Sequence, residues 1–154
     1  MGRAKLREAA TWSHLEQELR AACRAGLLQR AQALHQQGVS LTAAANNGWQ
    51  PIHSATAGGC LDVVQWLHQS GVGLSTAADN GWQPIHVAAA GGHLDLVQLL
   101  HVEGVSLGTA DRNGLQPIHA AAQNGRLDVV QWLHQQGVPL TAGSNPYRCL
   151  RPIK

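Results

Sequence analysis

The sequence predicts an all-α solenoid of stacked helix-turn-helix units. The heptapeptide Asn-Gly-Trp-Gln-Pro-Ile-His occupies residues 47–53 and recurs unchanged at residues 80–86, and a third copy with Leu in place of Trp occupies residues 113–119. The offset is 33 residues both times, and a constant period of this size is typical of stacked supersecondary units. The similarity extends beyond the heptapeptide, because residues 47–79 and 80–112 are identical at 22 of 33 positions.

Each unit reads as a turn, a helix, a second turn and a second helix. The Asn-Gly pair that opens each copy predicts a type I′ hairpin turn, with positive φ at both residues. Proline suits the first position of a helix, where its missing N–H costs nothing, and glycine is typical of the position after a helix. The first helices are expected to run from Pro51, Pro84 and Pro117 to about Ala57, Ala90 and Gln123, and the second helices to begin at Leu61, Leu94 and Leu127.

The 33-residue register also defines the domain organisation. We expect a repeat domain over residues 14–145, with units at 14–46, 47–79, 80–112 and 113–145. The first unit lacks the Gly-Trp-Gln-Pro start and carries more charge, which suits the end of a stack, whose outer face meets water. Residues 1–13 are expected to be a flexible or weakly helical lead. Residues 146–154 are expected to be a short tail, whose Arg-Pro-Ile-Lys resembles the start of a truncated further repeat.

Residues 81–93 carry a specific resemblance to a known family. Their sequence, Gly-Trp-Gln-Pro-Ile-His-Val-Ala-Ala-Ala-Gly-Gly-His, is similar to the ankyrin repeat pattern Gly-x-Thr-Pro-Leu-His-x-Ala-Ala-x-x-Gly-His, which a Leu-Leu helix and Gly-Ala follow. The resemblance implies an ankyrin-repeat solenoid of antiparallel helix pairs with projecting β-hairpin turns, and a role in binding other proteins. It also implies that one histidine per copy ties neighbouring repeats together: His53, His86 and His119.

One departure from the family pattern concerns the helix caps. Gln50, Gln83 and Gln116 stand where the family has Thr, whose hydroxyl caps the first helix. Because Gln is a weaker cap, we expect a deficit of up to about 1 kcal/mol per repeat.

Nine histidines raise the question of metal binding. Four of them form a ladder, one per repeat, at the second Leu of the family's Leu-Leu pair: His35, His68, His101 and His134. Successive members are separated by one repeat, roughly 10 Å, whereas Zn–N bonds are about 2.0–2.1 Å long. We therefore expect no metal site and no cofactor. If the ladder rings are buried and neutral, protonation near pH 5–6 is expected to loosen the stack.

Enzymatic motifs are absent from the sequence. It contains no Gly-x-Gly-x-x-Gly, P-loop, His-Glu-x-x-His or Gly-x-Ser-x-Gly. Cys60 stands at the start of a second helix, where the helix dipole lowers the pKa of a thiol, but its equivalents Leu27, His93 and Arg126 share no chemistry with it. We expect a protein without enzymatic activity in which Cys60 is structural or incidental.

Composition and charge indicate a soluble intracellular protein. No apolar run approaches the roughly 18 residues of a membrane helix, and no signal-peptide pattern is present. An odd number of cysteines without a Cys-x-x-Cys pair indicates reduced thiols. The net charge is only +2, and no basic stripe with interleaved aromatic residues occurs. We expect a cytoplasmic or nuclear protein that binds neither nucleic acid nor membranes.

The resemblance implies a partner surface as well, because hairpin tips and first-helix ends line the concave groove of ankyrin repeats. The residues so placed are Asn46, Asn47, Trp49, Ala57, Asp79, Asn80, Trp82, Ala90, Arg112, Asn113, Leu115, Gln123 and Asn124. Trp49 and Trp82 are informative, because tryptophan is enriched in binding hot spots; packing between hairpins is the alternative for both. Since the groove floor is small and uncharged, we expect an extended or helical peptide with apolar side chains.

Three functions are consistent with these patterns. The first is a non-enzymatic module that binds a partner protein or peptide. The second is a structural spacer or a repeat segment of a longer protein, either monomeric or weakly self-associating through its C-terminal face. The third is a metal- or pH-responsive module built on the histidines.

Overall fold

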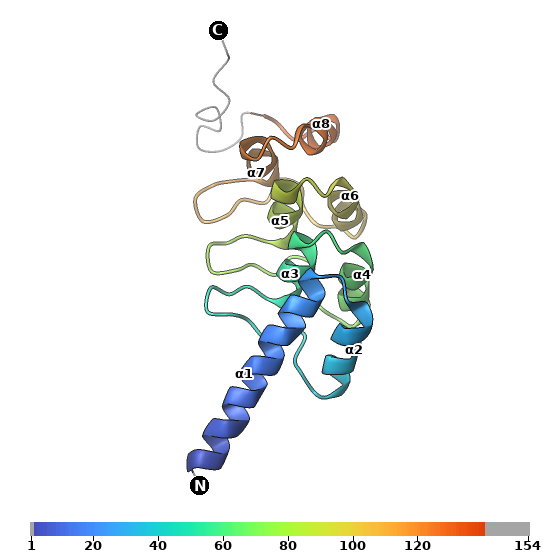
Figure 1. The fold of residues 1–154 in the computed structure, drawn as a ribbon. Coiled ribbons are helices and arrows are strands. Elements are labelled where there is room, and N and C mark those ends of the chain that lie inside the picture. Colours follow the sequence, from blue (N-terminus) through green and yellow to red (C-terminus); the bar gives the residue numbers. More distant parts are fainter. Residues whose placement is uncertain (1, 141–154) are drawn as a thin grey trace. The chain divides into compact units, whose positions relative to one another are not determined.

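The computed structural model describes residues 2–140, with side chains from residue 8 onward, and all regular secondary structure in this part of the chain is helical (Figure 1). The helices are α1 (Gly2–Arg24), α2 (Leu28–Gln36), α3 (Pro51–Ala57), α4 (Leu61–Gln69), α5 (Pro84–Gly91), α6 (Leu94–Val102), α7 (Pro117–Gln123) and α8 (Leu127–Gln135). This order of short helix pairs confirms the predicted all-α repeat architecture. Within residues 2–140, none of the helices combines the length and the hydropathy that a membrane span requires.

The chain divides into two compact units, an N-terminal unit of Met1–Val72 and a C-terminal unit of Gly73–Lys154. In the N-terminal unit, α1 packs against α2 and α3, and α3 packs against α4. In the C-terminal unit, α5 packs against α6 and α7, α7 packs against α8, and α6 contacts α8. Each unit therefore holds two helix pairs, in which the first helices of consecutive repeats contact each other.

Helix α1 extends further toward the N-terminus than the repeat register indicates. Residues 2–13, for which we expected a flexible or weakly helical lead, belong to the same helix as residues 14–24. The sequence between Gly2 and Gly26 contains no Gly or Pro and is rich in Ala, Leu, Glu and Arg, which have high helix propensity. The expected tail, residues 146–154, lies outside the described residues.

The ends of the later helices follow the local sequence signals. Helices α3, α5 and α7 begin at a proline, and α4, α6 and α8 begin at a leucine. At the end of α4, the Gly71 N–H donates to the His68 carbonyl and the Val72 N–H donates to the Leu67 carbonyl, both at 3.0 Å. These two bonds form a Schellman motif, which satisfies carbonyls that the helix end leaves without a partner.

The hairpin turns are not of the predicted type I′. In the first hairpin, residues 45–49, Gly48 has φ of +78°, but no residue other than glycine has positive φ within residues 2–140. The Gly48 N–H donates to the Ala45 carbonyl and the Ala45 N–H donates to the Trp49 carbonyl, both at 2.9 Å. This is a three-residue loop in which a type I turn is followed by a left-handed glycine. The Asn47 side chain accepts a hydrogen bond from the Trp49 N–H at 3.0 Å, which holds Asn47 in the right-handed region.

The second hairpin, residues 78–82, and the third, residues 111–115, repeat the same pair of backbone bonds. Each hairpin precedes the first helix of its repeat and projects to one side of the helices in Figure 1.

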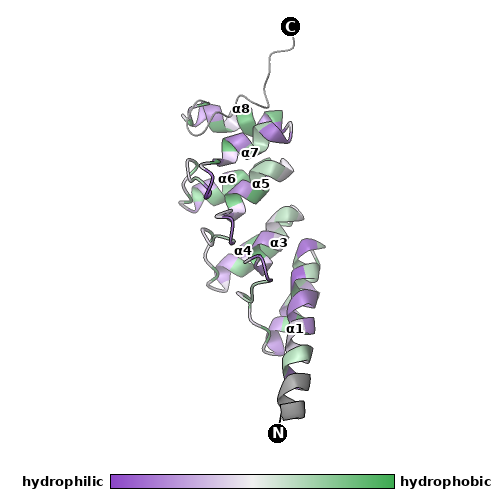
Figure 2. Ribbon diagram, turned by 90° about the vertical axis from the view of Figure 1, so that its left-hand side faces the viewer, coloured by the Kyte–Doolittle hydropathy of each residue, from purple (hydrophilic) through white to green (hydrophobic). Residues whose placement is uncertain are grey.

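The core of each unit consists of equivalent apolar residues from successive repeats. Ile52 and Leu67 in the N-terminal unit, and Ile85, Leu100 and Leu133 in the C-terminal unit, are completely buried. Hydrophobic and hydrophilic residues are interspersed along the helices in Figure 2, and in α4 the buried residues Val63, Val64 and Leu67 form the apolar side.

Candidate functional site

The histidine of the repeated heptapeptide connects the first helix to two turns. His86 is completely buried. Its Nδ1 accepts a hydrogen bond from the Gln83 N–H at 3.1 Å, so the ring proton is on Nε2, which donates to the Leu115 carbonyl in the third hairpin at 3.0 Å. Burial lowers the pKa of His86, and the Leu115 carbonyl and the nearby Asp111 carboxylate partly oppose this shift. His86 therefore ties one repeat to the next as a neutral ring.

His119, one repeat later, has only one of these two hydrogen bonds. Its Nδ1 accepts from the Gln116 N–H at 3.1 Å. The residue is 3% exposed, and its Nε2 is buried without a hydrogen-bond partner among the described residues. Burial lowers the pKa of His119. Within residues 2–140, the donor that ties α5 to the third hairpin thus has no counterpart bond at the corresponding position of α7.

Before the first helices of the second and fourth repeats, the glutamine side chains make no capping hydrogen bond. The side-chain oxygens of Gln50 and Gln116 are buried and lack a hydrogen-bond partner among the described residues. The backbone N–H of Gln50 instead donates to Nδ1 of His53 at 3.1 Å. The histidine therefore satisfies a backbone donor of the helix start, whereas the buried glutamine oxygens remain a cost.

Trp82 is held within the C-terminal unit by polar and aromatic contacts. Its indole Nε1 donates to the Asp111 carboxylate at 3.0 Å, and its ring stacks on His86 with 6.0 Å between centroids. The backbone N–H of Arg112 donates to the Asn80 carbonyl at 3.2 Å, which joins the second and third hairpins. These contacts favour the packing alternative for Trp82. Asp111 was missed by sequence reasoning, although the 33-residue alignment shows it replacing an alanine of the two earlier hairpins.

Trp49 has a different environment in the N-terminal unit. Its ring lies against His53, with 5.2 Å between centroids, and it is half-buried. Its indole N–H has no hydrogen-bond partner in the part of the chain that the structure describes. It borders a pocket of about 450 Å³ between α1 and the first hairpin, which is lined by Arg20, Ala21, Arg24, Ala45, Asn47, Trp49 and Ser54.

The two arginines of this pocket were not among the predicted site residues. A signal for them exists in the repeat register, because Arg20 aligns with the structural histidines and Arg24 aligns with Ala57, Ala90 and Gln123. The divergence of the first repeat concealed both positions.

The predicted partner-surface residues lie at the hairpin tips and the ends of the first helices. Eight side chains are exposed and five are half-buried: the exposed ones are Asn46, Asn47, Asp79, Asn80, Arg112, Asn113, Gln123 and Asn124, and the half-buried ones are Trp49, Ala57, Trp82, Ala90 and Leu115. Two of the exposed asparagines also stabilise the turns, since Asn47 and Asn80 accept hydrogen bonds from the Trp49 and Trp82 N–H groups.

All four histidines of the ladder are exposed. The pH sensitivity predicted for the ladder required buried, neutral rings, so that prediction is wrong. Two members of the ladder, His35 and His101, contact a tryptophan ring of the next repeat. His35 and Trp66 form an edge contact with 6.1 Å between centroids, and His101 and Trp132 form one at 5.7 Å. Among the described residues, no group of three or more His, Cys, Asp or Glu side chains is placed to hold a metal ion.

Cys60 has a structural role. Its equivalent Arg126 makes a similar hydrogen bond, although we expected the two residues to have nothing in common. Its Sγ donates to the Arg24 carbonyl at 3.4 Å, and Arg126 at the equivalent position donates from Nε to the Ala90 carbonyl at 3.0 Å. Both side chains thus bond to the end of the preceding first helix. Burial and then the nearby Asp62 carboxylate raise the pKa of Cys60, so the helix dipole does not activate this thiol. The pKa of the buried Cys23 is raised to about 12, mainly by burial.

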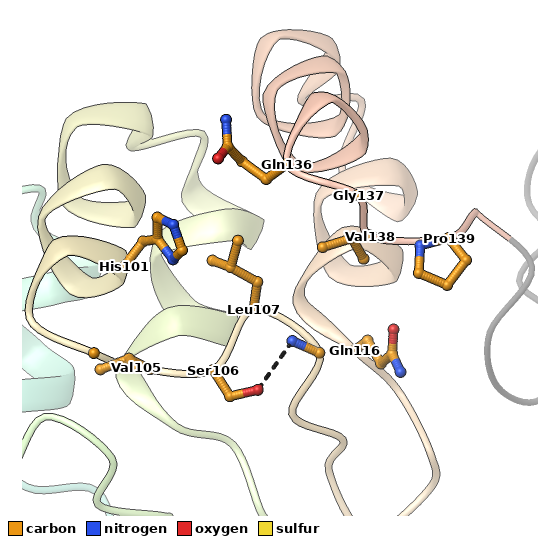
Figure 3. A pocket seen from close by; sticks show the side chains of 11 residues that line it. His101, Val105, Ser106, Leu107, Gln116, Gln136, Gly137, Val138 and Pro139 are labelled. Carbon is orange, nitrogen blue, oxygen red and sulfur yellow. Dashed lines mark hydrogen bonds between the residues drawn. The ribbon is translucent and has the colours of Figure 1, made fainter.

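A second pocket, of about 420 Å³, lies in the C-terminal unit between the loops that follow α6 and α8 (Figure 3). Figure 3 shows His101, Leu107 and Val138 around it, with a hydrogen bond of 3.3 Å from the Gly108 N–H to the Ser106 hydroxyl. His101 is its one titratable lining residue among those described. A lone imidazole provides no pair of acid and base groups here.

Comparisons with known proteins identify the family. Residues 19–68 match the family model for ankyrin repeats (many copies), and residues 70–143 match the model for ankyrin repeats (3 copies). A comparison with curated proteins gives no significant match. Ankyrin repeats are generally protein-protein interaction modules, and the family is typically non-enzymatic. The two matches, together with the helix pairs, the hairpins and the histidine that joins them, confirm that the chain belongs to the ankyrin repeat family.

Proposed function

We propose that this protein is a non-enzymatic module that binds a partner protein or peptide on its hairpin surface, meaning the hairpin tips and the ends of the first helices. The observation that carries the proposal is the environment of Trp49. This side chain is half-buried, borders a pocket, and has no hydrogen-bond partner for its indole N–H among the described residues. At the equivalent position, the indole N–H of Trp82 donates a hydrogen bond to the Asp111 carboxylate.

The surroundings of Trp49 support a binding role. Tryptophan contributes strongly to binding when a partner covers its ring and satisfies its N–H. The neighbouring Asn46 and Asn47 are exposed, and Ala57 at the end of α3 is small, so a partner backbone can approach the hairpin closely. The packing alternative accounts for Trp82 more fully than for Trp49.

A selection from a random peptide library displayed on phage tests this function. Peptides selected on the intact protein are expected to bind the Trp49→Ala variant at least about tenfold more weakly, which is the usual loss at a hot spot. Trp66→Ala is the matched control, because Trp66 is also half-buried in the N-terminal unit but lies on α4. Circular dichroism verifies that both variants are folded. If no peptide is selected, or if Trp49→Ala binds as the wild type does, the proposal is wrong.

Self-association through the C-terminal face is the second candidate function. It is favoured by His119, whose buried Nε2 has no hydrogen-bond partner among the described residues, whereas the Nε2 of His86 donates to the Leu115 carbonyl. A second copy that offers a backbone carbonyl there would satisfy this donor. Sedimentation equilibrium between micromolar and millimolar concentrations is expected to show a dimer that His119→Ala weakens. A monomer over this whole range would eliminate this candidate.

We also propose a cytoplasmic or nuclear location and no binding to nucleic acids or membranes. Cys23 and Cys60 are free thiols, which suits a reducing compartment. A fluorescent fusion observed in cells is expected to give cytoplasmic or nuclear signal, and a signal in the secretory pathway would contradict this location.

A further inference from the structure

We propose that the pocket beside Trp49 receives an acidic side chain of the partner, an Asp or Glu that stands next to an apolar residue in an extended peptide. This inference rests on the proposed function and specifies the chemistry of the partner at one position of the same surface. We call this pocket the arginine pocket, after Arg20 and Arg24, which line it together with Trp49.

The two arginines come from one face of α1. They are four residues apart and therefore lie one helical turn apart on the same side. The Arg20 Nη1 donates to the Ala43 carbonyl at 3.0 Å, which fixes this half-buried guanidinium beside the first hairpin. A guanidinium has five N–H donors, so this bond leaves others for a ligand. Arg20 is thus positioned before any ligand binds, which reduces the entropy lost on binding.

The positive charge of the arginine pocket is not neutralised by the described residues. The ion pair between Arg30 and Glu18 lies outside this pocket. Glu16 lies one turn before Arg20 on α1 but is not among the lining residues, and no acidic side chain lines the pocket. Two unpaired guanidinium groups at one pocket attract a carboxylate, with which arginine forms paired charge-assisted hydrogen bonds.

The apolar residues that line the pocket beside the two arginines favour an apolar residue next to the acid in the partner. The Trp49 ring and the side chains of Ala21 and Ala45 are apolar, so an apolar residue adjacent to the carboxylate has a surface to contact. A pocket of about 450 Å³ suits one or two side chains. This adds one acidic residue to the peptide with apolar side chains that the sequence predicts, because the pocket at the first repeat is basic.

The arginine pocket occurs only at the first repeat of the sequence. The positions equivalent to Arg20 and Arg24 are His53 and Ala57 in the next repeat, and His86 and Ala90 in the one after it. The acidic residue of the partner should therefore bind beside the first hairpin, in the N-terminal unit.

The test uses fluorescein-labelled versions of the peptides selected on the intact protein. The selected sequences are expected to be enriched in Asp or Glu next to an apolar residue. Replacing that acid by its amide in the peptide, or Arg24→Gln in the protein, is expected to weaken binding about tenfold, which corresponds to the loss of one hydrogen bond between charged groups. Arg24 is the better variant because its side chain has no hydrogen bond or ion pair among the described residues.

Arg30→Gln is the matched control, since it removes the same charge from an exposed arginine that pairs with Glu18 outside the arginine pocket. It is expected to change the affinity by less than twofold, and raising the salt concentration is expected to weaken the wild type more than Arg24→Gln. If the peptides lose affinity on Trp49→Ala but not on Arg24→Gln, the proposed function stands and this inference is wrong. Equal losses for Arg24→Gln and Arg30→Gln also overturn it, as does tighter binding when phosphoserine replaces the acid. If no peptide is selected, both proposals fail.

Discussion

At the scale of single residues, His86 and His119 have the same position in consecutive repeats but different hydrogen bonds. His86 accepts from the Gln83 N–H and donates to the Leu115 carbonyl, whereas the Nε2 of His119 has no partner in the described chain. An unpaired buried donor costs free energy, while a paired one contributes about 1 kcal/mol. Equivalent residues therefore make unequal contributions to stability.

Replacing the two histidines by alanine should reveal this difference. We expect His86→Ala to lower the free energy of unfolding by about 1–2 kcal/mol more than His119→Ala, because it leaves the Leu115 carbonyl without its donor. Urea denaturation followed by circular dichroism measures both values. Equal losses would contradict the difference, since the two variants remove the same atoms.

The same buried rings predict a dependence of stability on pH. Burial lowers the pKa of His86 and His119 below the ordinary value of 6.5 in the folded protein. Below about pH 6.5 the unfolded chain therefore binds more protons than the folded chain, so the free energy of unfolding falls as the pH falls. The stabilisation is complete above this pH and is lost as the pH decreases through the folded-state pKa values.

Thermal melts at pH 7.5, 6.5 and 5.5 measure this dependence. We expect the wild type to lose stability between pH 6.5 and 5.5, and His86→Gln to lose less over the same interval. The exposed ladder residue His101 provides the control, because His101→Gln should retain the full loss. If His101→Gln reduces the loss of stability between pH 6.5 and 5.5 more than His86→Gln does, the ladder histidines cause the pH dependence.

At the scale of elements, the contact between α1 and α3 depends on the absence of a side chain. A Cβ atom at Gly58, the residue after α3, would lie 2.0 Å from the Arg24 carbonyl oxygen and 3.1 Å from the Cys60 Sγ. No side chain fits there without moving one helix. In contrast, a Cβ at Gly108 in the loop after α6 would meet nothing within 4 Å.

Alanine substitution distinguishes these two glycines. Gly58→Ala is expected to destabilise the protein by about 1–3 kcal/mol, the usual cost of overpacking, with α1 and α3 pushed apart. Gly108→Ala is expected to leave stability unchanged or to raise it slightly, because it restricts the unfolded chain without a clash. Denaturant midpoints of the two variants provide the comparison, and a neutral Gly58→Ala would disprove the close contact.

The boundaries of the elements were predictable to different degrees. Proline before the first helices and the leucine that opens the second ones are local signals, and α3 to α8 begin at these residues. The hairpin type was wrongly predicted, because the Asn47 side chain accepts the Trp49 N–H and keeps Asn47 out of the left-handed region. The extension of α1 to Gly2 depends on summed helix propensity rather than on any repeat signal.

At the scale of the whole molecule, α4 and α8 form an internal comparison. Both have the sequence Leu-Asp-Val-Val-Gln-Trp-Leu-His-Gln, one in the N-terminal unit and one in the C-terminal unit. Val64 of α4 is completely buried, whereas its equivalent in α8, Val130, is half-buried. Leu61 is half-buried, whereas its equivalent Leu127 is 66% exposed.

The difference in burial between α4 and α8 should appear as a difference in their amide hydrogen exchange rates. Identical sequences give nearly identical intrinsic exchange, so we expect the amides of α8 to exchange faster than those of α4 because fewer buried contacts oppose its opening. Exchange measured by NMR at each of the nine positions makes the comparison residue by residue. Equal protection of the two helices would show that the exposed residues of α8 do not weaken it.

The sequence by itself determined that α4 and α8 are helices with an apolar stripe, because residue spacing and terminal residues act locally. It also determined the 33-residue period and, through it, the family, the hairpin positions and the candidate partner surface. Only the tertiary structure decided how far each identical stripe is buried and that two arginines of α1 lie beside Trp49. It also decided that the Trp82 indole N–H donates to Asp111, whereas the Trp49 indole N–H has no hydrogen-bond partner among the described residues. These outcomes depend on contacts between residues far apart in the chain, which a repeat pattern leaves open because it assigns equivalent residues the same role.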